Sequence, residues 1–217
     1  MDFPDIEKGV TSVNHLVRTV LLGLTLVLAS SAVQAQTKTI AYGQTSVTLN
    51  SGFVSALGNL GVTPGVVRPS ELEEGKVTFP VTGGVVDLQT ARGEISHSGG
   101  LTLTAGSTEV RLQSFTIDTT GSSPILTGLV VVNDKLVGRL PLFNLQLPAG
   151  LTLPLKPSGE GVLRLKGVGV TLNATAAGAL NGVFKLSGSN ALPSNFPIGT
   201  ANVYLVFQGH HADEDDN

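Results

Sequence analysis

Apolar and polar residues alternate along most of the chain. Between Lys76 and Leu103, the residues Val77, Phe79 and Val81 alternate with polar residues and a proline, which is the period of a strand with one buried face. The same segment contains two glycine pairs, Gly83-Gly84 and Gly99-Gly100. Because glycine adopts positive φ at little cost, each pair predicts a hairpin turn or a bulge.

Further segments with alternation or with β-branched apolar runs predict strands at residues 36–49, 109–118, 125–132, 135–147, 162–172 and 201–207. The alternation slips by one position between Leu112 and Phe115, which predicts a β-bulge. Asn133-Asp134 separates two apolar runs and predicts a tight hairpin turn.

Two short segments have helical spacing instead. Ser51 is the expected N-cap of a helix with Phe53, Val54, Leu57 and Leu60 on one face, ending near Gly61. Asn173 is the expected cap of a second helix over residues 174–184, and Ala176, Ala177, Leu180 and Phe184 follow one face of it. Between the first helix and the Lys76 strand, residues 62–65 predict a turn and residues 69–75 a polar loop.

These elements predict an all-β fold, either a sandwich or a partly open barrel, with two short helices. The strand spacing suggests roughly nine to twelve short antiparallel strands. The composition agrees, since the chain has 27 glycines and no tryptophan. The length after the N-terminal segment suits a single domain.

The N-terminal segment, residues 1–35, has the pattern of a signal peptide. Arg18 precedes an apolar run that ends in Val33-Gln34-Ala35, which fits cleavage before Gln36. The apolar run is shorter than the roughly 20 residues that span a bilayer, so we expect no stable membrane span after cleavage; a retained anchor is the alternative. The expected organisation is therefore a signal peptide at 1–35, one domain at 36–209 and an acidic disordered tail at 210–217. A secreted or cell-surface location follows.

Charge and cysteine content exclude several classes of protein. The formal net charge is −3, with no strongly basic segment, so we expect no nucleic-acid partner. The absence of cysteine excludes disulfides, thiolate catalysis and cysteine metal sites.

The sequence carries no P-loop, no H-E-x-x-H and no G-x-S-x-G motif, and we expect a non-enzymatic protein. The alternative is a catalytic triad in which His97 joins a serine and either Asp87 or Asp118. Glu71, Glu73 and Glu74 form either a solvated loop or a divalent-cation site. His210-His211, beside Asp213–Asp216, belong either to a solvated tail or to a metal site.

His97 has two interpretations. It is either a strand histidine whose ring nitrogens are satisfied inside the protein, or a ligand or gate at a binding site. The second interpretation rests on the neighbouring Gly99-Gly100, because glycine allows a flat ligand to approach the backbone. Taken alone, the residues favour the first interpretation.

Three segments resemble HtaA-type domains. They are G-E-I-S-H-S-G-G-L-T-L at 93–103, V-R-L-Q-S-F-T-I-D at 110–118 and V-T-L-N-A-T-A-A-G-A-L at 170–180. They are similar to that family's H-x-G-x-L turn, the alternating strand after it, and its closing L-T-x-x-A-A segment. HtaA-type domains are exported or surface-attached and β-rich, and some bind haem through a tyrosine supported by a histidine.

The resemblance implies a surface-exposed binding domain for haem or another flat apolar ligand, or for a surface protein partner. It places His97 at the position of the supporting histidine and leaves Tyr42 and Tyr204, the only tyrosines, as candidate iron ligands. The family's early segment is rich in tryptophan and tyrosine, whereas residues 51–60 here contain Phe53 and no tyrosine. The alternative is a structural envelope or extracellular-matrix protein without a small-molecule site.

Overall fold

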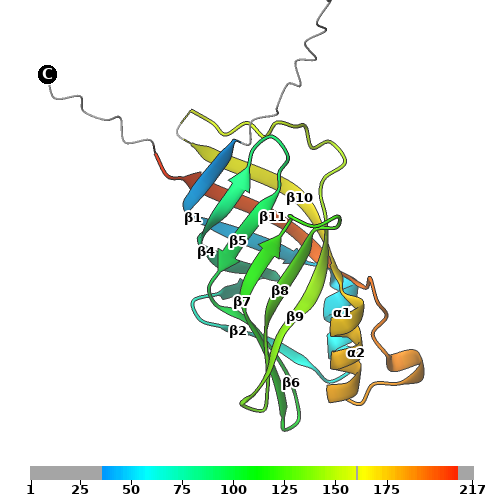
Figure 1. Ribbon diagram of the computed structural model, residues 1–217. Helices are drawn as coiled ribbons and strands as arrows, with labels where there is room; N and C mark the ends of the chain where they lie inside the picture. The colour runs from blue at the N-terminus through cyan, green and yellow to red at the C-terminus, as the bar shows by residue number, and fades with distance from the viewer. Residues whose placement is uncertain (1–35, 160, 210–217) are drawn as a thin grey trace, which may run out of the picture. The chain divides into compact units, whose positions relative to one another are not determined.

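The computed structural model describes residues 36–159 and 161–209, which form a β-rich unit with two short helices (Figure 1). In chain order the elements are β1 Thr37–Leu49, α1 Ser51–Asn59, β2 Thr63–Val67, β3 Glu71–Glu73, β4 Lys76–Asp87, β5 Gly93–His97, β6 Gly100–Ala105, β7 Thr108–Asp118, β8 Ile125–Val132, β9 Lys135–Gln146, β10 Val162–Leu172, α2 Ala174–Val183, the short 3₁₀ turn η1 Gly188–Asn190 and β11 Pro197–Phe207. The predicted signal peptide and acidic tail lie outside the described residues.

Eight of the strands close into an antiparallel barrel. Their order is β7-β5-β4-β1-β11-β10-β9-β8, and the pairing of β7 with β8 completes the ring. β6 and β2 extend the sheet beyond β7, and β3 pairs with β4. The predicted all-β fold class is confirmed, and the barrel is closed.

β7 pairs with two different strands along one of its edges, because its partner changes partway along its length. Its first half pairs with β6, and its second half pairs with β5. At the change, the register with β8 shifts between Gln113 and Thr116, and Ser114 has a φ of 54°. This confirms the predicted bulge between Leu112 and Phe115.

The two glycine pairs also mark breaks in the strands. Gly83 lies at a register shift inside β4, which makes that pair a bulge. Gly99 separates β5 from β6 with a φ of +78°, and a Cβ there would collide with Ser70. Asn133 and Asp134 have φ of 46° and 63°, the left-handed values of a type I′ turn, which confirms the β8–β9 hairpin.

The helices α1 and α2 are both drawn at the lower right of Figure 1, where α2 partly covers α1. The predicted second cap is confirmed, because the Asn173 side chain accepts a hydrogen bond from the Thr175 backbone N–H at 2.9 Å. The first cap was predicted one residue too late. Asn50, rather than Ser51, accepts hydrogen bonds from the backbone N–H groups of Gly52 and Phe53.

Two predicted connections are strands in the structure. Residues 63–67 form β2 instead of a turn, and residues 71–73 form β3 within the predicted polar loop. Pro64 is tolerated because β2 pairs only with β6 and leaves its other edge unpaired. Neither β2 nor β3 has a clear alternation of apolar and polar residues. Each forms a strand through its hydrogen bonds to the neighbouring strand, β6 or β4.

The barrel interior is almost entirely apolar. Its inward side chains come from alternate positions of every barrel strand and from the underside of the helices. Thr45, Ser70 and His97 are the only buried polar residues in the described part of the chain. Among the described residues, no helix combines the length and the apolar character needed to cross a membrane.

Candidate functional site

A small cavity lies between the two helices and the barrel, and we call it the cap cavity. Its volume is about 40 Å³, and apolar residues alone line it. α1 contributes Phe53 and Leu57, and α2 contributes Ala176 and Leu180. The remaining wall is made by Leu49, Leu60, Val62, Pro64, Leu72, Val77, Leu101, Leu103, Leu112, Leu142, Phe143, Leu172, Phe184, Leu186, Leu192 and Ile198.

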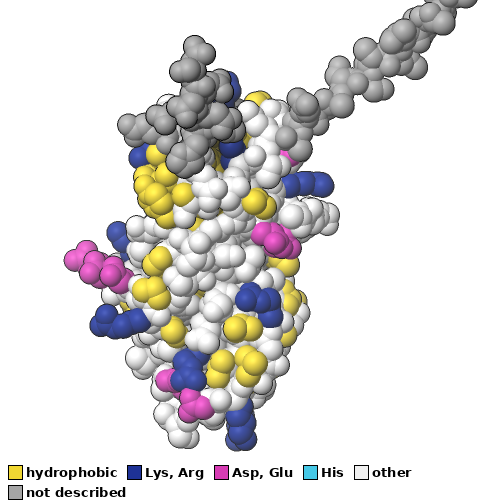
Figure 2. Space-filling view, turned by 60° about the vertical axis from the view of Figure 1, so that its left-hand side comes forward, with side chains coloured by type: hydrophobic (Ala, Val, Ile, Leu, Met, Phe, Trp, Pro, Cys, Tyr) yellow, Lys and Arg dark blue, Asp and Glu magenta, His cyan; other side chains and the backbone are white. Residues whose placement is uncertain are grey.

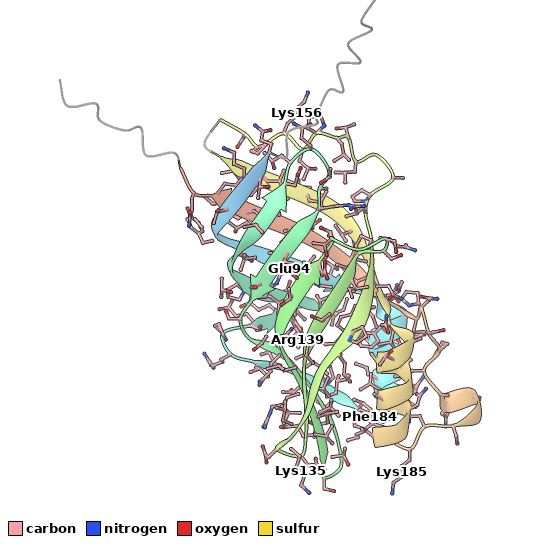
Figure 3. All side chains as sticks on the ribbon, in the orientation of Figure 1. Glu94, Lys135, Arg139, Lys156, Phe184 and Lys185 are labelled. Atoms are coloured by element: carbon pink, nitrogen blue, oxygen red, sulfur yellow. The ribbon has the colours of Figure 1, made fainter. Side chains whose placement is uncertain are left out.

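α1 covers this cavity with few contacts of its own. Leu57 is its only buried residue, and Phe53 is half-buried with its ring edge-on to Phe196 at 6.4 Å between centroids. Gly61, with a φ of +66°, ends the segment. Figure 3 labels Phe184 at the end of α2, which contributes to the same cavity wall. α1 therefore attaches to the cavity wall through one buried side chain and a few half-buried ones.

A second cavity of about 50 Å³ lies inside the barrel and contains the one described histidine. It shares wall residues with the cap cavity, among them Leu49, Leu101 and Phe143. The Nε2 atom of His97 lies 2.8 Å from the Thr45 hydroxyl oxygen, within hydrogen-bonding distance. His97 is 5% exposed, and its Nδ1 atom has no hydrogen-bond partner.

Burial controls the protonation of His97. Loss of solvation lowers the pKa of its imidazole from 6.5 to about 4. The backbone groups of Phe115 and Ile95 oppose this lowering of the pKa, but neither reaches Nδ1 with the geometry of a hydrogen bond. The ring is therefore neutral at neutral pH, so it is a polar group in an apolar interior rather than a charge.

The structure does not bring Tyr42 and Tyr204 together with His97. Tyr42 is 59% exposed on β1, and Tyr204 is half-buried on β11 with the Arg164 guanidinium 5.0 Å from its ring centre. Both tyrosines lie on the outer face of the barrel wall, whereas His97 points inward. Figure 2 shows no histidine among the described side chains of this face, in keeping with the burial of His97.

The carboxylates of Asp87 and Asp118, the candidate triad members, accept hydrogen bonds within their own turns. Asp87 accepts hydrogen bonds from the backbone N–H groups of Gln89 and Thr90, and Asp118 accepts from Thr120. The hydrogen bond to Thr45 is the only side-chain hydrogen bond of His97 within residues 36–159 and 161–209.

His210 and His211, one of the two candidate metal sites, lie outside the described residues. Within those residues, the glutamates at 71, 73 and 74 belong to no cluster of three metal-ligating side chains.

An iron-ligated haem does not fit these residues. The cap cavity offers no oxygen, nitrogen or sulfur side-chain atom to a metal. The cap cavity and the cavity beside His97 hold about 40 and 50 Å³, whereas sites for ligands of this size need roughly 300 Å³ or more. An apolar ligand at the cap requires α1 to move, and it would be held by surface contact alone.

The sequence identified the apolar faces of both helices but missed Thr45 as the partner of His97. A threonine in a strand gives no signal of its own, because its hydroxyl is equally common on a solvated face. The outward direction of Tyr204 was readable, since Ala201, Val203 and Leu205 alternate with it on the buried face. For Tyr42 the register shift between Ile40 and Tyr42 hides the same signal.

Comparison with known proteins identifies the fold. Neither a known protein-family description nor a curated protein sequence matches the chain. Among solved structures, the C-terminal domain of HtaA from Corynebacterium glutamicum aligns at 14% identity with a TM-score of 0.58, covering 79% of this chain and 99% of that domain. The N-terminal domain of the same protein aligns at 11% identity with a TM-score of 0.57, covering 78% of this chain and 99% of that domain. The heme-binding protein HtaB from the same organism aligns at 12% identity with a TM-score of 0.53, covering 79% of this chain and 95% of that protein's chain. The chain thus has the fold of HtaA and HtaB domains, as the sequence resemblance predicted.

Proposed function

We propose that this chain is a non-enzymatic, extracytoplasmic binding domain that takes a flat apolar ligand beneath α1 and α2. The observation that carries the proposal is the cap cavity, whose wall is wholly apolar and is closed by a helix with a single buried side chain. The signal-peptide pattern at residues 18–35 and the fold shared with the heme-binding protein HtaB support the location and the ligand class.

Opening the cap has an energetic cost. Lifting α1 exposes Leu57 and the half-buried Phe53 and Leu60, and full burial of a single leucine side chain is worth about 1.5–3 kcal/mol. A flat ligand that buries about 200 Å² of apolar surface recovers about 5 kcal/mol at 25 cal/mol per Å². This gain sets the scale that the cost of lifting α1 and the entropic cost of association must not exceed.

The wholly apolar wall of the cap cavity determines the class of ligand that we expect there. With no metal-ligating atom in the cap cavity, the iron of a haem would contribute nothing to binding there. A porphyrin without iron is expected to bind as well as haem. The ligand is recognised by its flat apolar face.

A pair of matched variants tests this site. Ala176 and Ala177 are neighbours on α2 and are equally buried at 4% exposure, but only Ala176 lines the cap cavity. Ala176→Leu fills the cavity and is expected to weaken binding of protoporphyrin IX, followed by fluorescence, by about tenfold or more. Ala177→Leu overpacks the same helix without filling the cavity and controls for general damage. Equal affinities in the two variants would overturn the site.

The small interior volumes favour a second candidate, a structural envelope or matrix protein with no small-molecule site. The interior cavities beneath the helices and around His97 hold only about 40 and 50 Å³. If the wild-type protein shows no saturable binding of protoporphyrin IX, this second function replaces the first.

A further inference from the structure

A shallow groove of about 230 Å³ lies on the outer face of the barrel, across β10, β11 and β1. Its side chains are Gln44, Ser46, Arg164, Lys166, Asn202 and Tyr204. Strand register places them side by side, since Tyr204 pairs with Gln44 on one side and Arg164 on the other, and Asn202 pairs with Ser46. The groove is separate from the cap cavity.

A bulge in β10 shapes one wall of the groove. The register of β10 with β11 shifts between Leu165 and Val168, and Gly167 there has a φ of +80°. The Asn202 side chain accepts a hydrogen bond from the Gly167 backbone N–H at 3.1 Å and so holds the bulge in place. Lys166 therefore projects beside the groove from a fixed backbone position.

The guanidinium of Arg164 is held in position by Tyr204. Its central carbon lies 5.0 Å from the centre of the tyrosine ring, within the range of a cation–π interaction. Arg164 is exposed, and its N–H groups form no ion pair within the described residues. A guanidinium matches a carboxylate, which it can bind through two parallel hydrogen bonds.

Neither cation has a carboxylate partner in the described part of the chain. The ion pairs found there all belong to Arg111. Three amide or hydroxyl side chains, Gln44, Ser46 and Asn202, surround the two cations. The exposed ring of Tyr42 lies next along the same face of β1.

From this arrangement we infer that the groove binds an acidic polysaccharide, with a sugar carboxylate on Arg164 and Lys166 and sugar hydroxyls on the surrounding amides and hydroxyls. Tyr42 offers an amphipathic aromatic surface to the neighbouring sugar ring. A nucleic acid is disfavoured because the groove has only two cations and the chain is acidic overall. Basic side chains are also spread over the face seen in Figure 2 rather than gathered in one patch.

Isothermal titration of the full chain with four polymers tests the inference. Polygalacturonate supplies carboxylates and hydroxyls, polyglutamate carboxylates alone, dextran hydroxyls alone, and oligothymidylate a phosphate backbone. We expect polygalacturonate to bind about tenfold or more tighter than each of the others. Added salt should weaken that binding without abolishing it, because hydrogen bonds to the sugar persist.

Variants connect the binding to the groove. Arg164→Gln combined with Lys166→Gln is expected to weaken polygalacturonate binding by about tenfold or more. Lys135→Gln combined with Arg139→Gln removes the same two residue types from β9 and serves as the control; Figure 3 labels both, with Lys135 at the tip of the β8–β9 hairpin. Circular dichroism and the melting temperature should be unchanged in both double variants.

Three results would overturn the inference. One is equal affinity for polyglutamate and polygalacturonate, which would reduce the groove to a site of bare charge. Another is tighter binding of oligothymidylate. The third is that the wild type does not bind polygalacturonate, or that the groove variant binds it as tightly as the wild type does. None of these results bears on the cap cavity, whose ligand carries no charge requirement.

Discussion

The buried histidine makes the fold sensitive to acid in a way that can be calculated. His97 has a pKa of about 4 in the folded protein and about 6.5 when unfolded. The unfolded chain therefore binds the proton more tightly, and unfolding takes up a proton between pH 6.5 and pH 4. The stability contributed by the neutral ring is complete above pH 6.5 and is lost as the pH falls through this window.

The magnitude follows from the two pKa values. A pKa difference of one is worth about 1.4 kcal/mol, so complete protonation of His97 lowers the free energy of unfolding by about 3 kcal/mol. Between pH 7.5 and pH 4.5 most of this loss has occurred, roughly 2–3 kcal/mol. His97 is 5% exposed, so solvent screening reduces the effect little.

The assay is urea unfolding of the wild type and of His97→Gln at both pH values. Glutamine keeps a hydrogen-bonding side chain near Thr45 and does not titrate. Because the other titrating groups are common to both proteins, the wild type should lose roughly 2–3 kcal/mol more than the variant on acidification. Thr45→Val removes the hydrogen-bond partner but keeps the imidazole, so its acid sensitivity should persist. Parallel pH dependence in the wild type and His97→Gln would refute the reasoning.

Three substitutions test the described backbone, each by urea unfolding at pH 7.5. Gly178→Ala, in α2 with open space around the new methyl group, should raise the free energy of unfolding by about 0.5–1 kcal/mol; no gain would contradict the exposed helical position. Gly99→Ala should lower it by about 2 kcal/mol or more, because a Cβ at φ +78° collides with Ser70; a neutral result would exclude that close approach. Asn173→Ala should cost about 1 kcal/mol through the lost cap, and an unchanged midpoint would argue against capping.

The parts of the fold that the sequence predicted are those determined locally. The Asn133-Asp134 turn and the bulge near Ser114 each leave a signature within a few residues, so both were found. β2 and β3 were missed because their hydrogen-bond partners, β6 and β4, supply the ordering that their own residues do not. Closure of the barrel through β7 and β8 depends on pairings all around the ring and has no local signature.

The candidate site divides in the same way. Helical spacing identified the faces of α1 and α2 that line the cap cavity. The position of His97 was recognised, but its environment was not, because Thr45 lies 52 residues away along the chain. The outer groove was not recognised, since it joins Gln44, Arg164 and Asn202 from three strands that become neighbours only in the folded barrel.

The central claim is that the cap cavity recognises a flat apolar face and offers no ligand to a metal. The most direct measurement compares the dissociation constants of haemin and iron-free protoporphyrin IX for the same protein preparation, with the haemin absorption spectrum recorded at saturation. Saturable one-to-one binding of both, with constants within about threefold and no sign of an axial protein ligand, is the predicted result. A preference for haemin of about a hundredfold or more, with the spectrum of a ligated iron, would contradict it.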